Sequence, residues 1–223
     1  VNGGSITYNE EDLEVKRVVE ASENTIRKLP YHTPEYTVEN GQTLLETPEG
    51  PLPIEVFGAH NLNNLAGAKW ICQHMGVDEE DFYEAIASFK GASKRLEKIA
   101  EGKNSVAYKD FAHSPSKVEA TTKAVKAQYQ DRTVVACLEL HTYSSLNAEF
   151  LKEYKGTLDA ADVGVVFYSP HAVEIKKLEK VTHEQIANAF ERDDLIIYTN
   201  PDDFKNFLFS QDFKNKALLL MSS

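Results

Sequence analysis

The stretch over residues 58–68 reads Gly-Ala-His-Asn-Leu-Asn-Asn-Leu-Ala-Gly-Ala and separates short strand patterns from a long helical pattern. It places His60, Asn61 and Asn64 in the first turns of a helix, where free backbone N–H groups and the helix dipole suit an electronegative ligand edge. Asn61 and Asn64 are three residues apart, so their carboxamides share one face and offer the donors and acceptors that read a nucleobase. The alternative is that His60 or Asn61 only caps the helix.

The segments before this helix predict a small antiparallel meander. Residues 5–8 have a strand pattern, and residues 11–28 are expected to form a short helix. Asn40-Gly41 lies between two strand patterns and is a strong hairpin signal. A second turn at residues 48–51 leads to a third strand. The helix that follows includes Trp70, which we expect in the core.

Beyond residue 91, strand and helix patterns alternate. Strands are expected at residues 96–99, 105–108, 133–138, 163–167, 195–198 and 217–220, and helices at 115–129, 147–154, 183–191 and 201–209. Strands that are apolar nearly throughout and alternate with helices predict a parallel sheet covered on both faces. The fold class is therefore α/β, with a domain boundary near residues 89–92 that gives domains of residues 1–90 and 91–223.

Composition excludes several classes of function. The formal net charge of -11 disfavours nucleic-acid binding, which needs a basic surface. No run of about 18 apolar residues and no signal-peptide pattern occurs, so we expect no membrane association and a cytoplasmic protein. Cys72 and Cys137 lie in apolar patterns and are expected to be buried free thiols. No metal-ligand spacing is present, so no metal-binding residues are assigned.

Both ends of the sequence suggest a piece of a larger protein. The chain starts at Val1 without methionine, and it stops almost directly after an apolar strand. It also lacks a Gly-x-x-x-x-Gly-Lys-Ser/Thr loop, so nothing here cradles the β- and γ-phosphates of a nucleotide by itself. We expect parts for nucleotide recognition without the parts that transfer phosphate.

A basic loop lies at the predicted domain junction, with Lys90, Lys94 and Arg95 around Gly91. The planar guanidinium of Arg95 suits bidentate contacts, so Arg95 is the candidate partner of a phosphate or ribose. The alternative is a solvated basic loop.

A second polar segment follows the strand at residues 105–108 and opens a helix, the place where open α/β sheets bind ligands. Asp110 there could accept both ribose hydroxyls, and His113 could donate to a phosphate or a substrate carboxylate. Ser114 and Lys117 are assigned to substrate binding. The alternative is that Asp110 or Ser114 merely caps the helix.

Two further loops are expected at the carboxyl ends of strands. His141 lies in the first, at residues 139–145, and is assigned to substrate binding. Residues 169–171 form the second. Both give a weaker signal than the two segments before them.

Taken in order, the motifs resemble those of the Mur ligases, the bacterial ATP-dependent amide-forming enzymes of peptidoglycan synthesis. The motifs are Gly58-x-His60-Asn61-x-x-Asn64, Phe89-x-Gly91-x-x-x-Arg95-x-Glu97 and Asp110-Phe111-Ala112-His113-x-Pro115. Each motif is weak alone, but the three in this order and spacing are specific, and the resemblance covers nearly the whole chain.

The resemblance implies a three-domain parent that contains the end of an ATP-binding central domain at residues 1–90. Residues 91–223 would be a Rossmann-like C-terminal domain, truncated at its end. ATP and Mg²⁺ would be cofactors, with Mg²⁺ held mainly by an upstream part that carries the phosphate loop. A fragment without that loop is expected to be inactive alone.

The resemblance also implies roles for the candidate residues. Asn61 and Asn64 would face adenine, with His60 beside them, and Arg95 and Asp110 would meet the ribose or phosphates. His113 is the catalytic candidate, near the γ-phosphate and the incoming substrate.

The substrates implied are UDP-N-acetylmuramate and an amino acid or peptide. Two departures from the family pattern, at Ser114 and Thr142, leave the amine open between L-alanine and a recycled L-Ala-γ-D-Glu-meso-diaminopimelate tripeptide, and overall likeness favours the tripeptide. A non-catalytic nucleotide-binding module and a folylpolyglutamate-type ligase are the alternatives. No oligomeric state is predicted.

Overall fold

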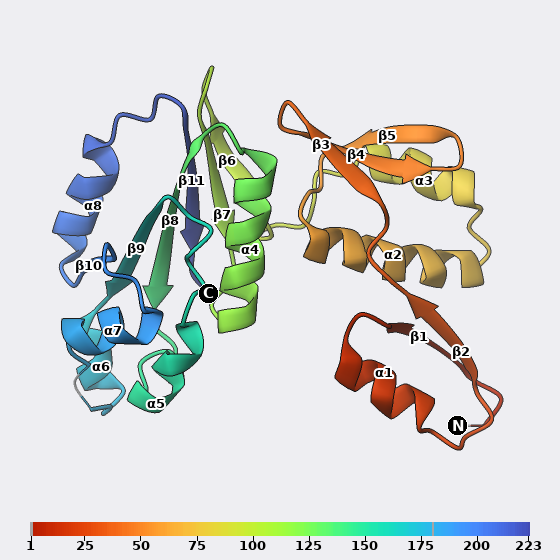
Figure 1. The fold of residues 1–223 in the computed structure, drawn as a ribbon, viewed down its shortest axis with the longest axis horizontal. Helices are drawn as coiled ribbons and strands as arrows, with labels where there is room; N and C mark the ends of the chain where they lie inside the picture. Colours follow the sequence, from red (N-terminus) through yellow and green to blue (C-terminus); the bar gives the residue numbers. More distant parts are fainter. Residues whose placement is uncertain (1, 180) are drawn as a thin grey trace. The chain divides into compact units, whose positions relative to one another are not determined.

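The computed structural model describes residues 2–179 and 181–223 (Figure 1). The chain divides into two compact units, Val1–Lys90 and Gly91–Ser223. Each unit has its own hydrophobic cluster, and each is described by itself below.

The first unit begins with two parallel strands, β1 (Ser5–Asn9) and β2 (Arg27–Tyr31), joined by helix α1 (Leu13–Glu20). The Asp12 carboxylate caps α1 by accepting from two backbone N–H groups of its first turn. The predicted helix over residues 11–28 is therefore too long, and β2 was not predicted. Only Val19 of α1 is buried, and pairing of β2 with β1 outweighs the helical spacing of the residues after Glu20.

The predicted meander is confirmed as an antiparallel sheet of β3 (Tyr36–Glu39), β4 (Gln42–Thr47) and β5 (Gly50–Ile54). Asn40 and Gly41 both have positive φ, 51° and 77°, as a tight hairpin turn between twisted strands requires. The sheet packs against the two helices that follow, α2 (Ala59–His74) and α3 (Glu79–Ala87). Their shared core is built from Leu45, Ile54, Leu62, Leu65 and Phe82.

The expectation that Trp70 lies in the core is wrong, because 37% of this side chain is exposed. The buried face of α2 carries Leu62 and Leu65, and Cys72 packs against the same core. Trp70 points off this face and lies near the His74 ring instead. Of the two free cysteines, Cys137 is buried, whereas Cys72 is only half-buried.

The second unit is a six-stranded sheet in the order β10-β9-β8-β11-β7-β6. All its pairings are parallel except that of β6 with β7, so the predicted parallel sheet is confirmed with one antiparallel edge strand. The strands are β6 (Glu97–Glu101), β7 (Val106–Asp110), β8 (Thr133–Leu140), β9 (Val163–Tyr168), β10 (Ile196–Tyr198) and β11 (Lys216–Met221).

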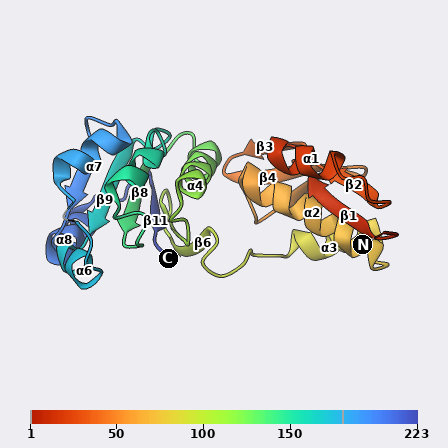
Figure 2. The same cartoon turned by 90° about the horizontal axis from the view of Figure 1, so that it is seen from below.

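Helices cover both faces of this sheet, with α4 and α7 on one side and α8 on the other (Figure 2). Phenylalanines of α8 pack on Val135, Cys137, Val165 and Leu218. On the opposite face α4 contacts β8 and β11, and Tyr154 stacks on Phe190 of α7. The helices are α4 (Pro115–Gln128), α5 (Ala148–Leu151), the 3-10 turn η1 (Lys152–Tyr154), α6 (Pro170–Ile175), α7 (His183–Phe190) and α8 (Pro201–Ser210).

Residues 169–171 do not form the expected loop, because helix α6 starts there. Ser169 is its N-cap and accepts from the Ala172 N–H, and Pro170 occupies the first helical position, where it loses no hydrogen bond. Among the described residues no helix is long and apolar enough to cross a lipid bilayer.

The sheet register brings three strand ends together. Met221, the last residue of β11, pairs with Asp110 of β7 on one side and with Leu138 of β8 on the other. The segments that follow β7, β8 and β11 therefore leave the sheet at a common carboxyl edge, where ligands bind in open α/β sheets.

Candidate functional site

In the first unit, the candidate residues lie at the start of α2. Gly58 is the N-cap residue, with φ 89° and no side chain to cap with, and its carbonyl accepts from the Asn61 and Leu62 N–H groups. The side-chain amide of Asn61 donates to the Phe57 carbonyl at 3.0 Å. Asn61 is therefore not the helix cap that the alternative interpretation required.

The three candidate side chains at the start of α2 differ in exposure. Asn61 and His60 are half-buried and Asn64 is exposed. Within the described part of the chain, the Asn64 carboxamide has no hydrogen-bond partner. The nucleobase assignment of these residues stays a prediction, and the geometry leaves the Asn64 amide ready to take a ligand.

Sequence reasoning missed the structural role of Asn63, the middle asparagine of the motif. Its amide nitrogen lies 2.9 Å from the Glu11 carboxylate, 3.2 Å from the Thr33 hydroxyl and 3.3 Å from the Asn9 side-chain oxygen. These contacts tie α2 to the carboxyl ends of β1 and β2. Hydrogen bonds to Glu11, above all from the Thr33 hydroxyl, lower the pKa of that carboxyl. Nothing in the sequence distinguishes this asparagine from Asn61 and Asn64.

In the second unit, Asp110 ends β7 and is buried, with only 4% of its surface exposed. One carboxylate oxygen accepts from the Leu96 N–H and the other from the Ala112 N–H, both at 2.7 Å. The carboxylate does not cap α4, because the N-cap residue of that helix is Ser114. Ser114 itself makes no capping bond with its side chain, so neither residue acts as the alternative interpretation proposed.

Arg95 lies on a turn that folds over the end of β7. Its guanidinium is 5.3 Å from the centre of the Phe111 ring, a cation–π contact, and the residue is exposed to solvent. The Glu97 carboxylate accepts from the Lys94 N–H at 2.7 Å and the Ser93 hydroxyl at 3.2 Å. The Lys94 N–H bond is the main reason that the pKa of Glu97 is lowered. The basic loop is thus an ordered turn.

His113 has a defined tautomer. Its Nδ1 is 2.8 Å from the Phe111 carbonyl, and a carbonyl can only accept, so Nδ1 carries a proton. In the neutral ring Nε2 is then an acceptor. The Phe111 ring packs edge-on against the His113 ring with centroids 5.2 Å apart, and the Tyr154 hydroxyl donates to the His113 backbone carbonyl. His113 is therefore half-buried and fixed in orientation.

His141 follows β8 and meets the end of β11. Its Nε2 is 2.5 Å from the Ser223 hydroxyl. Its Nδ1 is buried and has no hydrogen-bond partner among the described residues, and the Glu139 carboxylate lies 3.9 Å away. Glu139 accepts from the Ser222 hydroxyl, and the Ser222 N–H donates to the Asp110 carbonyl at 3.1 Å. These bonds link the ends of β8, β11 and β7.

The structure therefore brings Arg95, Asp110 and His113 together around Phe111. His141 lies along the same sheet edge, on the far side of β11. Lys117 is exposed in the first turn of α4. The sequence motifs contained Phe111 and Glu97, but they did not show what these residues do. Phe111 contacts the Arg95 guanidinium, and Glu97 orders the turn that carries Arg95.

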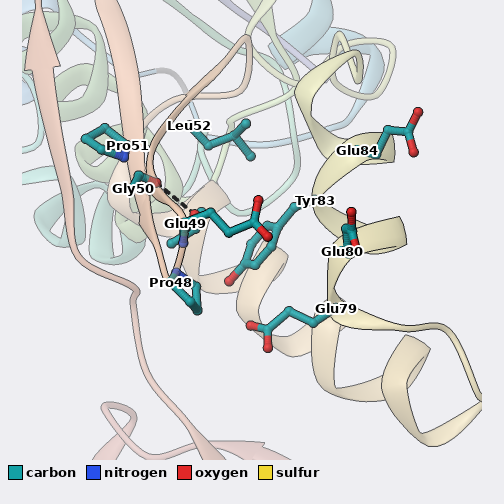
Figure 3. Close-up of a pocket in the computed structure, with 10 residues that line it drawn as sticks. Pro48, Glu49, Gly50, Pro51, Leu52, Glu79, Glu80, Tyr83 and Glu84 are labelled. Atoms are coloured by element: carbon teal, nitrogen blue, oxygen red, sulfur yellow. Dashed lines mark hydrogen bonds between the residues drawn. The ribbon is translucent and has the colours of Figure 1, made fainter.

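A cavity of about 570 Å³ lies elsewhere in the first unit, between the β4–β5 turn and α3 (Figure 3). Glu49, Glu80 and Glu84 line it, and Tyr83 lies among them. Lys69 forms an ion pair with Glu79 at its wall and donates to the Tyr83 hydroxyl at 2.8 Å. The cavity contains no candidate residue. Within residues 2–179 and 181–223, no group of three or more His, Cys, Asp or Glu side chains could hold a metal ion.

No family model matches the chain. A UDP-N-acetylmuramate–L-alanine ligase from Sulfurihydrogenibium sp. (strain YO3AOP1) is 26% identical over 229 residues, which cover 99% of this chain and 50% of the relative. The enzyme of the same name from Carboxydothermus hydrogenoformans is 30% identical over 181 residues, 78% of this chain and 37% of the relative. The chain thus spans about half the length, or less, of the curated relatives it matches.

A solved structure shares the fold of the chain. The MurF ligase of Thermotoga maritima, solved in complex with ADP, superposes with a TM-score of 0.66 at 15% identity, over 98% of this chain and 50% of that one. At this identity the match shows the fold alone. By its sequence relatives, the chain belongs to the Mur ligase family.

Proposed function

We propose that the chain is part of an ATP-dependent ligase that joins an amino acid or a peptide to UDP-N-acetylmuramate. The observation that carries this proposal is the alignment of 99% of the chain with a protein named UDP-N-acetylmuramate–L-alanine ligase. The fold shared with a MurF ligase that binds ADP supports the use of ATP.

The proposal gives each unit a place in the parent enzyme. Residues 1–90 correspond to the end of the central ATP-binding domain, and residues 91–223 to the Rossmann-like C-terminal domain. The separate cores of the two units support this division. ATP and UDP-linked sugars are intracellular metabolites, so the proposal places the protein in the cytoplasm.

In this reaction ATP supplies the phosphoryl group. A carboxylate oxygen of the muramate attacks the γ-phosphorus and ADP leaves, after which the amine attacks the acyl carbon, loses a proton and expels phosphate. The protein contributes mainly by positioning and by placing charge near the transferred group. No magnesium-binding residues are assigned in this chain, and the proposal leaves Mg²⁺ mainly to the upstream part of the parent enzyme that carries the phosphate loop.

We assign the candidate residues to different parts of the substrates. Asn61 and Asn64, with His60 beside them, would hold adenine. Arg95 would contact a phosphate from its fixed place over Phe111. His113 presents Nε2 as an acceptor in its neutral form, which suits a hydrogen bond from the incoming amine.

Three further residues are proposed for the amine substrate: Ser114, Lys117 and His141. The Ser114 side chain makes no capping bond, and Lys117 is exposed in the first turn of α4. His141 lies at the carboxyl edge of the sheet, where its orientation is set by Ser223. The Ser114 and Lys117 side chains can therefore turn toward a ligand at this edge, whereas His141 is held in one orientation.

L-Alanine is the first candidate for the amine, because the relatives that match are named for it. This reverses the preference for the recycled tripeptide that the sequence alone suggested. The tripeptide remains the second candidate because of Thr142. A threonine is uncharged, so position 142 offers no cation for the carboxylate of a small amino acid, and the Thr142 hydroxyl donates to Ser145 at 2.8 Å within the turn.

The test is phosphate release by the natural protein that carries this chain. The reaction contains ATP, Mg²⁺ and UDP-N-acetylmuramate, with L-alanine, the tripeptide or no amine. Release that depends on L-alanine supports the first candidate, and release that depends on the tripeptide supports the second. Nucleotide binding without release in any reaction would instead favour the non-catalytic module.

A further inference from the structure

We propose that Asn63 is a positioning residue for nucleobase recognition. Its side-chain amide fixes the start of α2 on the carboxyl ends of β1 and β2, which sets where Asn61 and Asn64 present their carboxamides. This role rests on the proposed nucleotide-binding function, because it is through these two asparagines that Asn63 would affect a bound nucleotide. Asn63 itself is given no contact with the ligand.

The Asn63 amide belongs to a network of hydrogen bonds. It lies 2.9 Å from a Glu11 carboxylate oxygen, 3.2 Å from the Thr33 hydroxyl and 3.3 Å from the Asn9 side-chain oxygen. The same Glu11 oxygen accepts from the Thr33 N–H at 3.1 Å and from the Thr33 hydroxyl at 2.7 Å. The Glu11 N–H in turn donates to the Asn9 side chain at 3.0 Å. One carboxylate therefore joins α2 to the segments that follow β1 and β2, through hydrogen bonds that its charge strengthens.

A second contact attaches the same side of α2 to β2. Gly67 lies four residues after Asn63, so the two residues share one face of the helix. A Cβ atom at Gly67 would lie 2.9 Å from the ring of Tyr31, the last residue of β2, so an alanine there would have to displace the ring. Glycine lowers the stability of a helix interior relative to alanine, and here it permits the close approach of helix and strand. Asn63 and Gly67 thus hold this face of α2 on the two strands.

The other faces of α2 leave the rotation of the helix about its axis less strictly defined. Leu62 and Leu65 pack in the core shared with the β3–β5 sheet, whereas Asn64 is exposed. Apolar packing is non-directional, but hydrogen bonds depend on angle, so the bonds of Asn63 define this rotation most strictly. Asn64 adjoins Asn63 and Asn61 lies two residues before it, so both carboxamides follow the setting of the helix. Groups placed in advance lose less freedom when they bind a ligand.

A nucleotide and an anion without a base separate this role from a general loss of folding. Asn63→Leu nearly keeps the volume of the side chain and removes its hydrogen bonds. It should weaken the binding of ATP about tenfold. The binding of inorganic triphosphate should stay the same, because this anion has no base for the carboxamides to contact. Both affinities are measured by calorimetry on the natural protein that carries this chain.

A second variant tests the network from the strand side. Glu11→Gln removes the charge of the carboxylate that Asn63 contacts and leaves α2 unchanged, so it should also weaken the binding of ATP and not that of triphosphate. In the double variant with Asn63→Leu the losses should be less than additive, since the two side chains act through one hydrogen bond. The matched control is Gln73→Leu, which removes an amide from the same helix. The Gln73 side chain has no hydrogen-bond partner in the described part of the chain, so this change should leave both affinities as they are.

Three binding results would overturn the proposal. Equal losses for ATP and triphosphate in Asn63→Leu would mean that Asn63 only stabilises the fold. Unchanged ATP binding would mean that the attachment does not reach the base site. A loss in Asn63→Leu with none in Glu11→Gln would assign Asn63 a direct contact with the nucleotide.

Backbone hydrogen exchange in the ligand-free protein tests the attachment without any nucleotide. The N–H groups of Asn61 and Leu62 bond to the Gly58 carbonyl at the start of α2, and that of Met75 bonds at its end. Asn63→Leu should speed exchange at the first two and leave exchange at Met75 unchanged, whereas equal acceleration at both ends would contradict a local attachment. If the unmutated protein binds neither ATP nor triphosphate, the proposed nucleotide binding fails, and the exchange result alone supports or overturns the attachment.

Discussion

Arg192 donates to three backbone carbonyls at the turn before β9: Leu158 at 2.5 Å, Ala161 at 2.9 Å and Asp162 at 3.1 Å. Its side chain is only 11% exposed, and Asp194 pairs with it on the open side. We predict that Arg192→Met destabilises the protein by about 2–4 kcal/mol, because the carbonyls lose charged donors. Urea unfolding followed by circular dichroism measures the change.

The matched control for Arg192→Met is Lys123→Met. Lys123 pairs with Glu119 on the surface of α4 and its side chain is 64% exposed, so the change should stay within about 0.5 kcal/mol. Equal effects of the two substitutions would contradict the role given to Arg192.

Asp162 carries a pH-dependent part of the stability. Burial raises the pKa of its carboxyl, but hydrogen bonds from Lys126 and from the Val134 N–H at 2.7 Å outweigh burial, so the pKa lies below the ordinary value. The folded state then binds fewer protons than the unfolded state near pH 4. The stabilisation is present above the unfolded pKa of about 4 and is lost as the pH falls through the lower folded value.

Asp162→Asn should therefore cost stability at pH 6, and the difference from the unmutated protein should shrink as the pH falls to about 3. Chemical unfolding at a series of pH values measures this trend. Asp131→Asn serves as the reference for an exposed aspartate in the same unit. A difference that stays constant with pH would show that the Asp162 contacts do not depend on its charge.

At the residue scale, the sequence predicted that certain polar side chains of the second unit lie close together, but it did not predict which groups they contact. Asp110, Arg95 and His113 lie together as the motifs indicated, yet the Asp110 carboxylate points to the backbone of its own unit. Asn63 looks like its neighbours in sequence and proves to be a bridge between α2 and the strand ends. Such differences depend on groups that only the fold brings close, backbone N–H groups for Asp110 and side chains from β1 and β2 and their following loops for Asn63, which no local pattern contains.

At the scale of elements, the N-caps of α8 and α4 differ in their hydrogen bonds, and unfolding measurements can test the effect of this difference on stability. Asn200, the N-cap of α8, accepts from the Asp202 and Asp203 N–H groups, whereas Ser114, the N-cap of α4, makes no capping bond with its side chain. We predict that Asn200→Ala costs about 1 kcal/mol and that Ser114→Ala costs almost nothing. Thermal unfolding of the two variants gives the comparison, and a larger loss for Ser114→Ala would refute it.

Long apolar patterns made most helices and strands predictable from the sequence. The elements that the sequence did not predict were missed for physical reasons. Strand β2 contains Pro30 and is only partly buried, so it has neither the alternation nor the composition of a strand, and its pairing with β1 defines it. Helix α6 was hidden because Ser169-Pro170 suits both a loop and a helix start. The insertion of β11 between β7 and β8 could not be predicted, since strand order depends on packing across the sheet.

At the scale of the whole molecule, the junction after Lys90 separates two units with separate cores, and both Lys90 and Phe89 are exposed. Trypsin cleaves segments that open locally. We predict that trypsin cuts first after Lys90 and releases a fragment that begins at Gly91. Mass spectrometry of a digestion time course identifies the cut.

The same digestion tests the ordered turn beyond the junction. Lys94 and Arg95 are exposed, but the Lys94 N–H bonds to Glu97, its carbonyl bonds to Phe111, and the Leu96 N–H bonds to Asp110. Cleavage after these two residues should therefore be slower than cleavage after Lys90.

Asp110→Asn should speed cleavage after Lys94 and Arg95 and leave cleavage after Lys103, in the turn between β6 and β7, unchanged as the internal reference. If trypsin cuts after Lys94 as fast as after Lys90 in the unmutated chain, the turn is not held in place. Arg95 would then become ordered only when it binds a phosphate, at a cost in affinity that an ordered turn avoids.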